Sequence, residues 1–239
     1  MTEVPCSAVE LATRAGVYRR DTARGGAGGY APRVPVRAED PAVRRRRRTP
    51  EAAQREIMEA AERLLQERPF RELTVDEVMR RTGLSRPSFY VYFKDRHELV
   101  LRIVGHVQGE ILRSANRWYD SVGGGPHVLR EALAGTVSVY ATHAAVMRAL
   151  ADAAVDDPRV EQAYGALVDG FVDITARHVE QEVATGLIPP IDPREAAKAL
   201  IWMTERYLYH SFGPTHRIST GRVHETLAAL WNRSLYQSS

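Results

Sequence analysis

The chain has 239 residues, of which 44% are hydrophobic and 26% charged, so it can bury a core of its own. It has no apolar run near the roughly 18 residues that suggest a membrane span. Its single cysteine, Cys6, excludes an intrachain disulfide and a cysteine-based zinc site, and we expect a cytoplasmic protein without a membrane anchor. The net charge of +3 is unevenly distributed, because residues 1–48 contain eleven arginines and only five acidic residues.

Residues 1–48 are expected to form a disordered basic N-terminal arm. Glycines cluster at residues 25–29 and prolines recur after them, so no apolar stretch could offset the entropy lost on ordering. The arm ends in five consecutive arginines, Arg44 to Arg48, which repel one another. Two interpretations stay open: a passive solvated tail, or an arm that touches the backbone or minor groove of DNA.

From residue 49 onward the chain has the pattern of successive helices. The first is expected between Thr49 and Pro69, because apolar residues recur there at helical spacing. A second begins at Thr74, where Thr-Val-Asp-Glu is a capping box, and ends at Gly83. A third, short helix is expected from Ser85 to about Tyr92. A fourth begins at Asp95, which caps it, and runs to about Trp118.

Further helical patterns follow, separated by glycine- and proline-containing loops, at roughly 127–143, 145–153, 158–185, 193–211 and 220–236. Strand signals are nearly absent. The sequence therefore predicts an all-α fold of about nine helices. We expect a DNA-binding domain over 49–95 and a larger helical domain over 96–239.

The second and third helices, with the tight turn at Gly83-Leu84-Ser85, have the spacing of a helix-turn-helix. The third helix would enter the major groove with its N-terminal residues leading. Ser85 is expected to cap this helix, and Arg86 can donate two hydrogen bonds to guanine. Pro87 can contact a thymine methyl group, and Ser88 can donate or accept a hydrogen bond.

The rest of the third helix is divided between core and DNA. Phe89 and Phe93, four residues apart, are expected in the core, whereas Tyr90 and Tyr92 lie off that face. The basic groups of Lys94 and Arg96, near the start of the fourth helix, suit phosphate binding.

Residues 56–101, including Gly-Leu-Ser-Arg-Pro-Ser-Phe-Tyr-Val-Tyr-Phe, resemble the DNA-binding domain of tetracycline-repressor (TetR) family regulators. Two positions depart from that family: Pro69 stands where most members have Gly, and Arg96 replaces the usual Lys. The resemblance implies base-proximal positions for Arg86, Pro87, Ser88 and Tyr90. Expected phosphate contacts are Thr74, Ser85, Tyr92, Lys94 and Arg96.

Over residues 49–236 the chain more loosely resembles the EthR-like subgroup, through Met203-Thr204-Glu205-Arg206, Phe212 and Leu230-Trp231. This resemblance implies a C-terminal domain that binds a ligand and dimerises. Only a bulky, largely apolar ligand can be argued, and its pocket is expected to be lined by Leu129, Leu133, Thr136, Tyr140, Phe171, Thr204 and Tyr207.

The last two helices each have an apolar face with small residues, from which we expect a four-helix dimer seam. Its predicted residues are Leu200, Leu208, Leu227, Trp231 and Leu235. The alternative is that these faces close the core of the single subunit.

The sequence disfavours two other classes of protein, an enzyme and a helical adaptor. An enzyme is disfavoured because the sequence lacks a His-Glu-x-x-His pair and a Gly-x-Ser-x-Gly elbow. A helical adaptor that has lost DNA binding is disfavoured by the intact base-reading residue types. We therefore expect a bacterial, nucleoid-associated homodimeric repressor, without metal or cofactor, that binds a palindromic operator and is released by a small apolar effector. Activation stays an alternative, since operator placement decides it.

Overall fold

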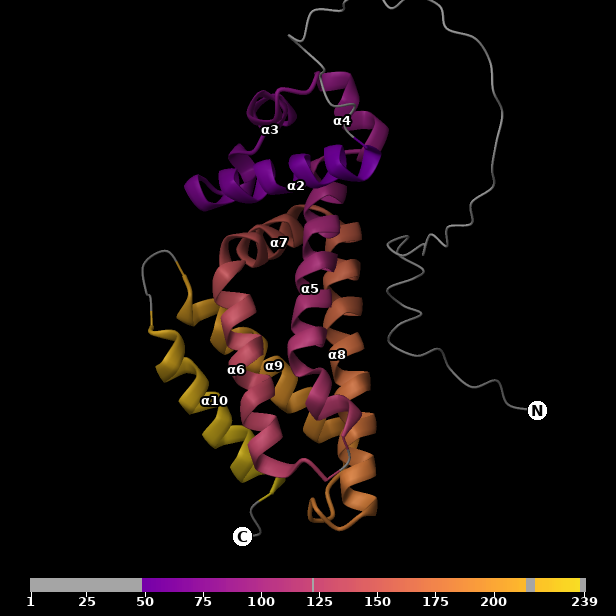
Figure 1. Cartoon of the computed structure of the whole chain (residues 1–239), viewed down its shortest axis with the longest axis vertical. Coiled ribbons are helices and arrows are strands. Elements are labelled where there is room, and N and C mark those ends of the chain that lie inside the picture. Colours follow the sequence, from indigo (N-terminus) through magenta and orange to yellow (C-terminus); the bar gives the residue numbers. More distant parts are fainter. Residues whose placement is uncertain (1–48, 122, 214–217, 237–239) are drawn as a thin grey trace, which may run out of the picture. The chain divides into compact units, whose positions relative to one another are not determined.

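The computed structural model describes residues 49–121, 123–213 and 218–236, and every multi-residue element in these ranges is helical (Figure 1). The basic arm predicted over residues 1–48 lies outside them. The α-helices are α2 (Pro50–Glu67), α3 (Val75–Thr82), α4 (Arg86–Tyr92), α5 (Arg96–Asp120), α6 (Gly125–Thr142), α7 (Ala144–Asp156), α8 (Pro158–Ala184), α9 (Pro193–Ser211) and α10 (Thr220–Leu235), with the 3-10 turn η1 (Phe70–Glu72).

The all-α prediction is confirmed, and most helix bounds lie within three residues of those predicted, because capping residues and prolines mark them. Thr74 accepts a hydrogen bond from the Glu77 amide, and Asp95 accepts from the amides of His97 and Glu98. The sequence did not predict η1, which follows Pro69, nor the extension to Asp156 of the helix that was expected at 145–153.

Helices α2, α3 and α4 form a small head. The apolar side of α2 is buried against Phe70, Val78 and Phe89 in one core cluster. In the view of Figure 1, α3 and α4 lie on one side of α2 and α7 on the other. Gly83 makes the turn between α3 and α4, with a φ of 66° in the left-handed region that favours glycine.

Helices α5 to α10 form a larger helical body. The long helices α5 and α8 run side by side in Figure 1, and α9 packs along α8. Helix α10 packs mainly against α6. The core continues from the head into this body, since the cluster that contains Phe89 also contains Val104, Leu150 and Leu227. In the described part of the chain, no helix is both long and apolar enough to cross a membrane.

Candidate nucleic-acid interface and ligand cavity

Helix α4 is fixed to the head by its two phenylalanines. Phe89 and Phe93 are 0% and 1% exposed, as predicted for core residues, and their ring centroids are 5.4 Å apart. Burial of Phe89 within the seven-residue helix, and of Phe93 immediately after it, sets the orientation of α4. The opposite side of α4 therefore stays in solvent.

The turn before α4 is closed by a residue that the sequence reasoning missed. The Thr82 side chain is buried, and its hydroxyl donates to the Met79 carbonyl at 2.8 Å and accepts from the Leu84 amide at 3.1 Å. This pair of bonds ties the end of α3 to the turn. A threonine immediately before the Gly83 cap was the available signal.

The residues predicted to approach bases lie at the exposed start of α4. Arg86 is exposed, with its Nε 3.4 Å from Oδ1 of Asp76. A hydrogen bond with Tyr90 and the nearby Asp76 carboxylate raise the pKa of Arg86, which stays charged. Pro87 is exposed, Ser88 is half-buried, and Tyr90 is 52% exposed.

Ser85 occupies the N-cap position of α4, but its side chain does not cap the helix. Its hydroxyl lies 2.9 Å from the Ser88 hydroxyl instead. The predicted capping bond is therefore wrong, although the helix does begin where the cap predicted. The two hydroxyls, from exposed Ser85 and half-buried Ser88, form a polar pair beside Arg86.

The other predicted phosphate contacts differ in their surroundings. Thr74 is exposed, but its hydroxyl already bonds Glu77 Oε2 at 2.9 Å within the capping box. Tyr92 is half-buried and packs against the core of the head. Lys94 is exposed, and its backbone amide donates to Glu98 Oε2 at 2.9 Å.

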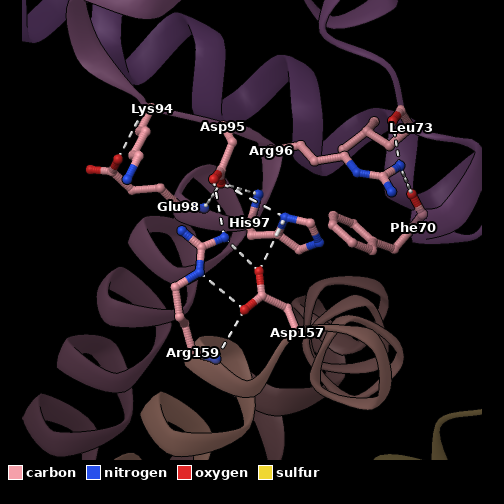
Figure 2. A network of polar contacts seen from close by, with 9 residues as sticks. All are labelled: Phe70, Leu73, Lys94, Asp95, Arg96, His97, Glu98, Asp157 and Arg159. Atoms are coloured by element: carbon pink, nitrogen blue, oxygen red, sulfur yellow. Dashed lines mark hydrogen bonds and ion pairs between the residues drawn. The ribbon is translucent and has the colours of Figure 1, made fainter.

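Arg96 has a structural role that the sequence reasoning did not foresee (Figure 2). One guanidinium nitrogen, Nη1, donates to the carbonyls of Arg71 at 3.2 Å and Leu73 at 3.1 Å, and lies 3.4 Å from that of Phe70. The guanidinium also lies over the Phe70 ring, 4.7 Å from its centroid. Arg96 therefore fastens the start of α5 to η1, and its contact with phosphate stays a prediction.

A polar network joins the start of α5 to the start of α8 (Figure 2). The two helices are capped by Asp95 and Asp157, and Arg159 bridges the caps, with Nη2 3.2 Å from Asp95 Oδ2 and 2.5 Å from Asp157 Oδ2. His97 Nδ1 lies 3.6 Å from Asp157 Oδ2. The hydrogen bond from Arg159 lowers the pKa of Asp157 to about 2.

A second polar contact joins the body to the head. His143, at the joint between α6 and α7, contacts Glu62 of α2 through Nδ1 and lies 3.3 Å from Glu110 of α5 through Nε2. Helix α7 also packs against η1. Helix α5 is therefore not the sole mechanical link between the head and the body in the part of the chain that the structure describes.

The body contains a cavity of about 90 Å³, several times the roughly 10–15 Å³ that one water molecule needs on the same measure. Its lining is mostly apolar and comes from α5 to α10. Of the seven residues predicted to line a pocket, Tyr207 does not, since it packs against a neighbouring part of the core. Those that do are Leu129, Leu133, Thr136, Tyr140, Phe171 and Thr204.

The five residues predicted for a dimer seam are buried within the single subunit, which corrects that prediction. All are at most 6% exposed: Leu200, Leu208, Leu227, Trp231 and Leu235. Leu208 and Trp231 line the cavity, and Trp231 Nε1 donates to the Thr204 hydroxyl at 2.8 Å. An apolar helix face in the sequence predicts that the face is buried. It does not identify the helices, from the same subunit or from another, that cover it.

A polar cluster in which His178 and Glu182 are buried and Tyr236 is half-buried lies at the far end of the body from the head. The Tyr236 hydroxyl donates to Glu182 at 2.6 Å, and His178 Nε2 lies 3.4 Å from the same carboxylate oxygen. Burial lowers the pKa of His178. This cluster ties α8 to α10. No group of three or more potential metal ligands occurs in the part of the chain that the structure describes.

Comparison with known proteins agrees with this architecture. Residues 57–103 match the family model "Bacterial regulatory proteins, tetR family", and residues 129–237 match "Transcriptional regulator EthR, C-terminal domain". The HTH-type transcriptional regulator EthR of Mycobacterium tuberculosis is 29% identical over 188 residues, which are 75% of this chain and 85% of that protein.

Solved structures share the fold at low identity. A TetR-family regulator from Syntrophomonas wolfei has a TM-score of 0.68 and 14% identity, over 77% of this chain and 95% of that one. AibR, solved in complex with isovaleryl coenzyme A and operator DNA, has a TM-score of 0.58 and 17% identity, over 74% and 97% of the two chains. The relatives named in these comparisons are regulators, not enzymes. The chain belongs to the TetR family of transcriptional regulators and is EthR-like.

Proposed function

We propose that this protein is a ligand-responsive repressor that binds a palindromic operator as a homodimer and releases it when an apolar ligand occupies the cavity. Residues 49–95 would bind DNA, and 96–239 would bind the ligand and the second subunit. The observation that carries the proposal is the exposed start of α4, which presents Arg86 and Tyr90 while Phe89 and Phe93 fix the helix.

Arg86 is suited to base readout. Its guanidinium is charged and exposed at the leading end of α4, and a bidentate contact to guanine O6 and N7 is the commonest specific contact in the major groove. Pro87 and Ser88 would meet neighbouring bases. Lys94 and Tyr92 would position the head on phosphates.

A homodimer would use the outer faces of α9 and α10. The five buried residues cannot form this interface, but the two helices also carry exposed apolar side chains. Trp202 is 37% exposed, and Leu230 is 41% exposed. Large exposed apolar side chains on neighbouring helices favour a self-complementary contact. A two-fold axis there would place two α4 helices in successive major grooves, about 34–36 Å apart.

The cavity would bind the effector. Its lining includes Tyr164, Leu167 and Phe171 of α8, the helix whose first turn carries Arg159 and so contacts the head. A ligand that spreads the lining would move the start of α8 and, through Asp95, the head. AibR was solved with both an acyl coenzyme A and operator DNA, which supports this mode of action by analogy. Such a regulator would act in the cytoplasm, at the nucleoid.

The proposal is tested by selecting DNA with the purified protein. Fragments retained from a random pool are sequenced, and the enriched motif is compared with a matched selection by the variant Arg86→Ala. We expect an inverted repeat whose half-sites lie about one helical turn apart. A pool without an enriched motif would overturn DNA recognition, and a motif without dyad symmetry would overturn the homodimer.

A further inference from the structure

The cavity contains an acidic group that an apolar ligand would leave without a hydrogen-bond partner. Glu205 of α9 is the acidic residue among the described lining residues, and its side chain is 12% exposed. Its Oε2 atom is buried and has no hydrogen-bond partner among the described residues. The same Oε2 atom forms an ion pair with Arg206, whose Nε lies at 3.4 Å, but the Arg206 side chain is half exposed and lies over Tyr209, outside the cavity lining.

Two phenols lie beside this carboxylate. The Tyr164 hydroxyl of α8 is buried, lines the cavity and has no hydrogen-bond partner in the described part of the chain. Burial, followed by the Glu205 carboxylate, raises the pKa of Tyr164 and that of Tyr140 of α6. Both phenols are therefore neutral near neutral pH. Buried polar atoms without partners are uncommon and unfavourable, so a ligand that satisfies them gains affinity.

The polar groups lie at one end of the cavity. Tyr140 is near the end of α6, Tyr164 is in the second turn of α8, and Met147 of α7 lines the same end. The opposite end is lined by Leu129 and Trp118, and the rest of the lining is mostly apolar, with polar side chains from Gln108, Thr136 and Thr204. This arrangement fits a molecule with one polar head and one apolar tail.

We propose that the effector is a cationic amphiphile, whose protonated amine binds Glu205 and the Tyr164 hydroxyl while its hydrocarbon tail lies along the apolar walls. This inference rests on the ligand-binding role proposed for the cavity. An ammonium group has three donors and no acceptor, so it can satisfy a carboxylate and a phenol oxygen together. A carboxylate head would face Glu205 with like charge.

The test uses three probes with the same eight-carbon tail: octylamine, 1-octanol and octanoate. Their binding to the full chain is measured by titration calorimetry at neutral pH, with the fluorescence of the cavity residues Trp118 and Trp231 as a second signal. We expect octylamine to bind most tightly and octanoate least. The variant Glu205→Gln should weaken octylamine binding about tenfold or more, while octanol binding stays within about twofold. The control Glu195→Gln, an exposed acid on the same helix, should change neither.

The outcomes separate this inference from the proposed function. If octanol binds but octylamine binds no more tightly, or if Glu205→Gln leaves the preference intact, the cationic head is wrong and the apolar ligand site stands. If none of the three probes binds, both are overturned. If Glu205→Gln fails to fold, the same three probes are titrated into Tyr164→Phe. A preference for octylamine over 1-octanol that is undiminished in this variant would overturn the inference.

Discussion

Arg86 has two neighbours on the surface of the head: Asp76, whose Oδ1 lies 3.4 Å from the Arg86 Nε, and Tyr90, one helical turn away. Both partners are themselves exposed, so neither withdraws the guanidinium from solvent. A pre-oriented side chain loses less conformational entropy when it binds a base. These contacts, at the leading end of α4, suit Arg86 to the base readout proposed for it.

We predict that Arg86→Ala weakens binding to the selected operator by about 1–3 kcal/mol and relaxes the preference at one base pair in each half-site. Fluorescence anisotropy with operator variants measures both effects. Arg177→Ala, which removes an exposed arginine from α8, is the charge-matched control and should leave the preference unchanged. An operator affinity and footprint unaffected by Arg86→Ala would remove this residue from base readout.

Asp157 gives the contact between α8 and α5 a defined pH dependence. Its pKa is lowered from 3.8 to about 2, first by the hydrogen bond from Arg159. A carboxyl group with a lowered pKa in the folded state stabilises the fold fully above its ordinary pKa. That contribution is lost as the pH falls from about 4 to about 2.

We predict that wild type has a higher unfolding temperature than Asp157→Asn at neutral pH, and that this difference shrinks as the pH falls from about 4 to about 2. Asparagine retains the ability to cap α8, so the comparison isolates the charge. Thermal unfolding followed by circular dichroism across this range gives the difference. A constant difference at every pH would show that the Asp157 charge does not contribute.

At the scale of elements, coupling between head and body passes through several contacts. Helix α5 is continuous from the head into the cavity lining, and Arg159 joins its cap to that of α8. His143 joins the α6–α7 joint to α2. Because these contacts converge near the same end of the cavity, a displacement of α6 or α8 there changes the support of the head.

We predict that Thr136→Trp, which places a large side chain into the cavity from α6, weakens 1-octanol binding and removes any effect of octanol on operator affinity. The DNA-contacting residues are untouched. Ser138→Trp, at an exposed position of the same helix, is the control and should retain both properties. Operator titrations with and without octanol provide the measurement. A normal octanol response in Thr136→Trp would place the ligand elsewhere.

Local signals predicted the helices well, since Thr74, Asp95 and Gly83 act within a turn of where they stand in the sequence. Contacts between distant segments were not predictable in this way. The bonds from Arg96 to the η1 carbonyls and from Arg159 to Asp95 depend on how α5, α7 and α8 pack.

The candidate pocket illustrates the same limit. Its aromatic and aliphatic lining followed from helical spacing and family resemblance, but Tyr207 faces another part of the core. Glu205 was noted only as a neighbour in the sequence motif, because nothing local distinguishes a carboxylate that faces a cavity from one that faces solvent. The prediction of the dimer residues was wrong for a related reason. An apolar residue such as Leu227 or Leu235 can pack against its own subunit or against another, and the sequence does not distinguish the two.

For the whole molecule, the charge of the N-terminal arm suggests an electrostatic contribution to DNA binding. We predict that a variant lacking residues 1–48 binds operator more weakly and that its log K falls less steeply with log salt concentration, because fewer counterions are released. Affinities measured at several salt concentrations give both slopes. Equal slopes for the two proteins would make the arm a passive tail.

The central claim is that one molecule couples a ligand in the body to DNA at the head. Binding linkage requires that each ligand change the affinity of the other by the same factor. The most direct measurement has two parts. The full-length protein is titrated with its selected operator at increasing octylamine concentrations, and it is also titrated with octylamine in the presence and absence of operator. The account predicts that both affinities fall by one common factor, about 5- to 150-fold. Octylamine binding that is equally tight with and without operator would contradict it.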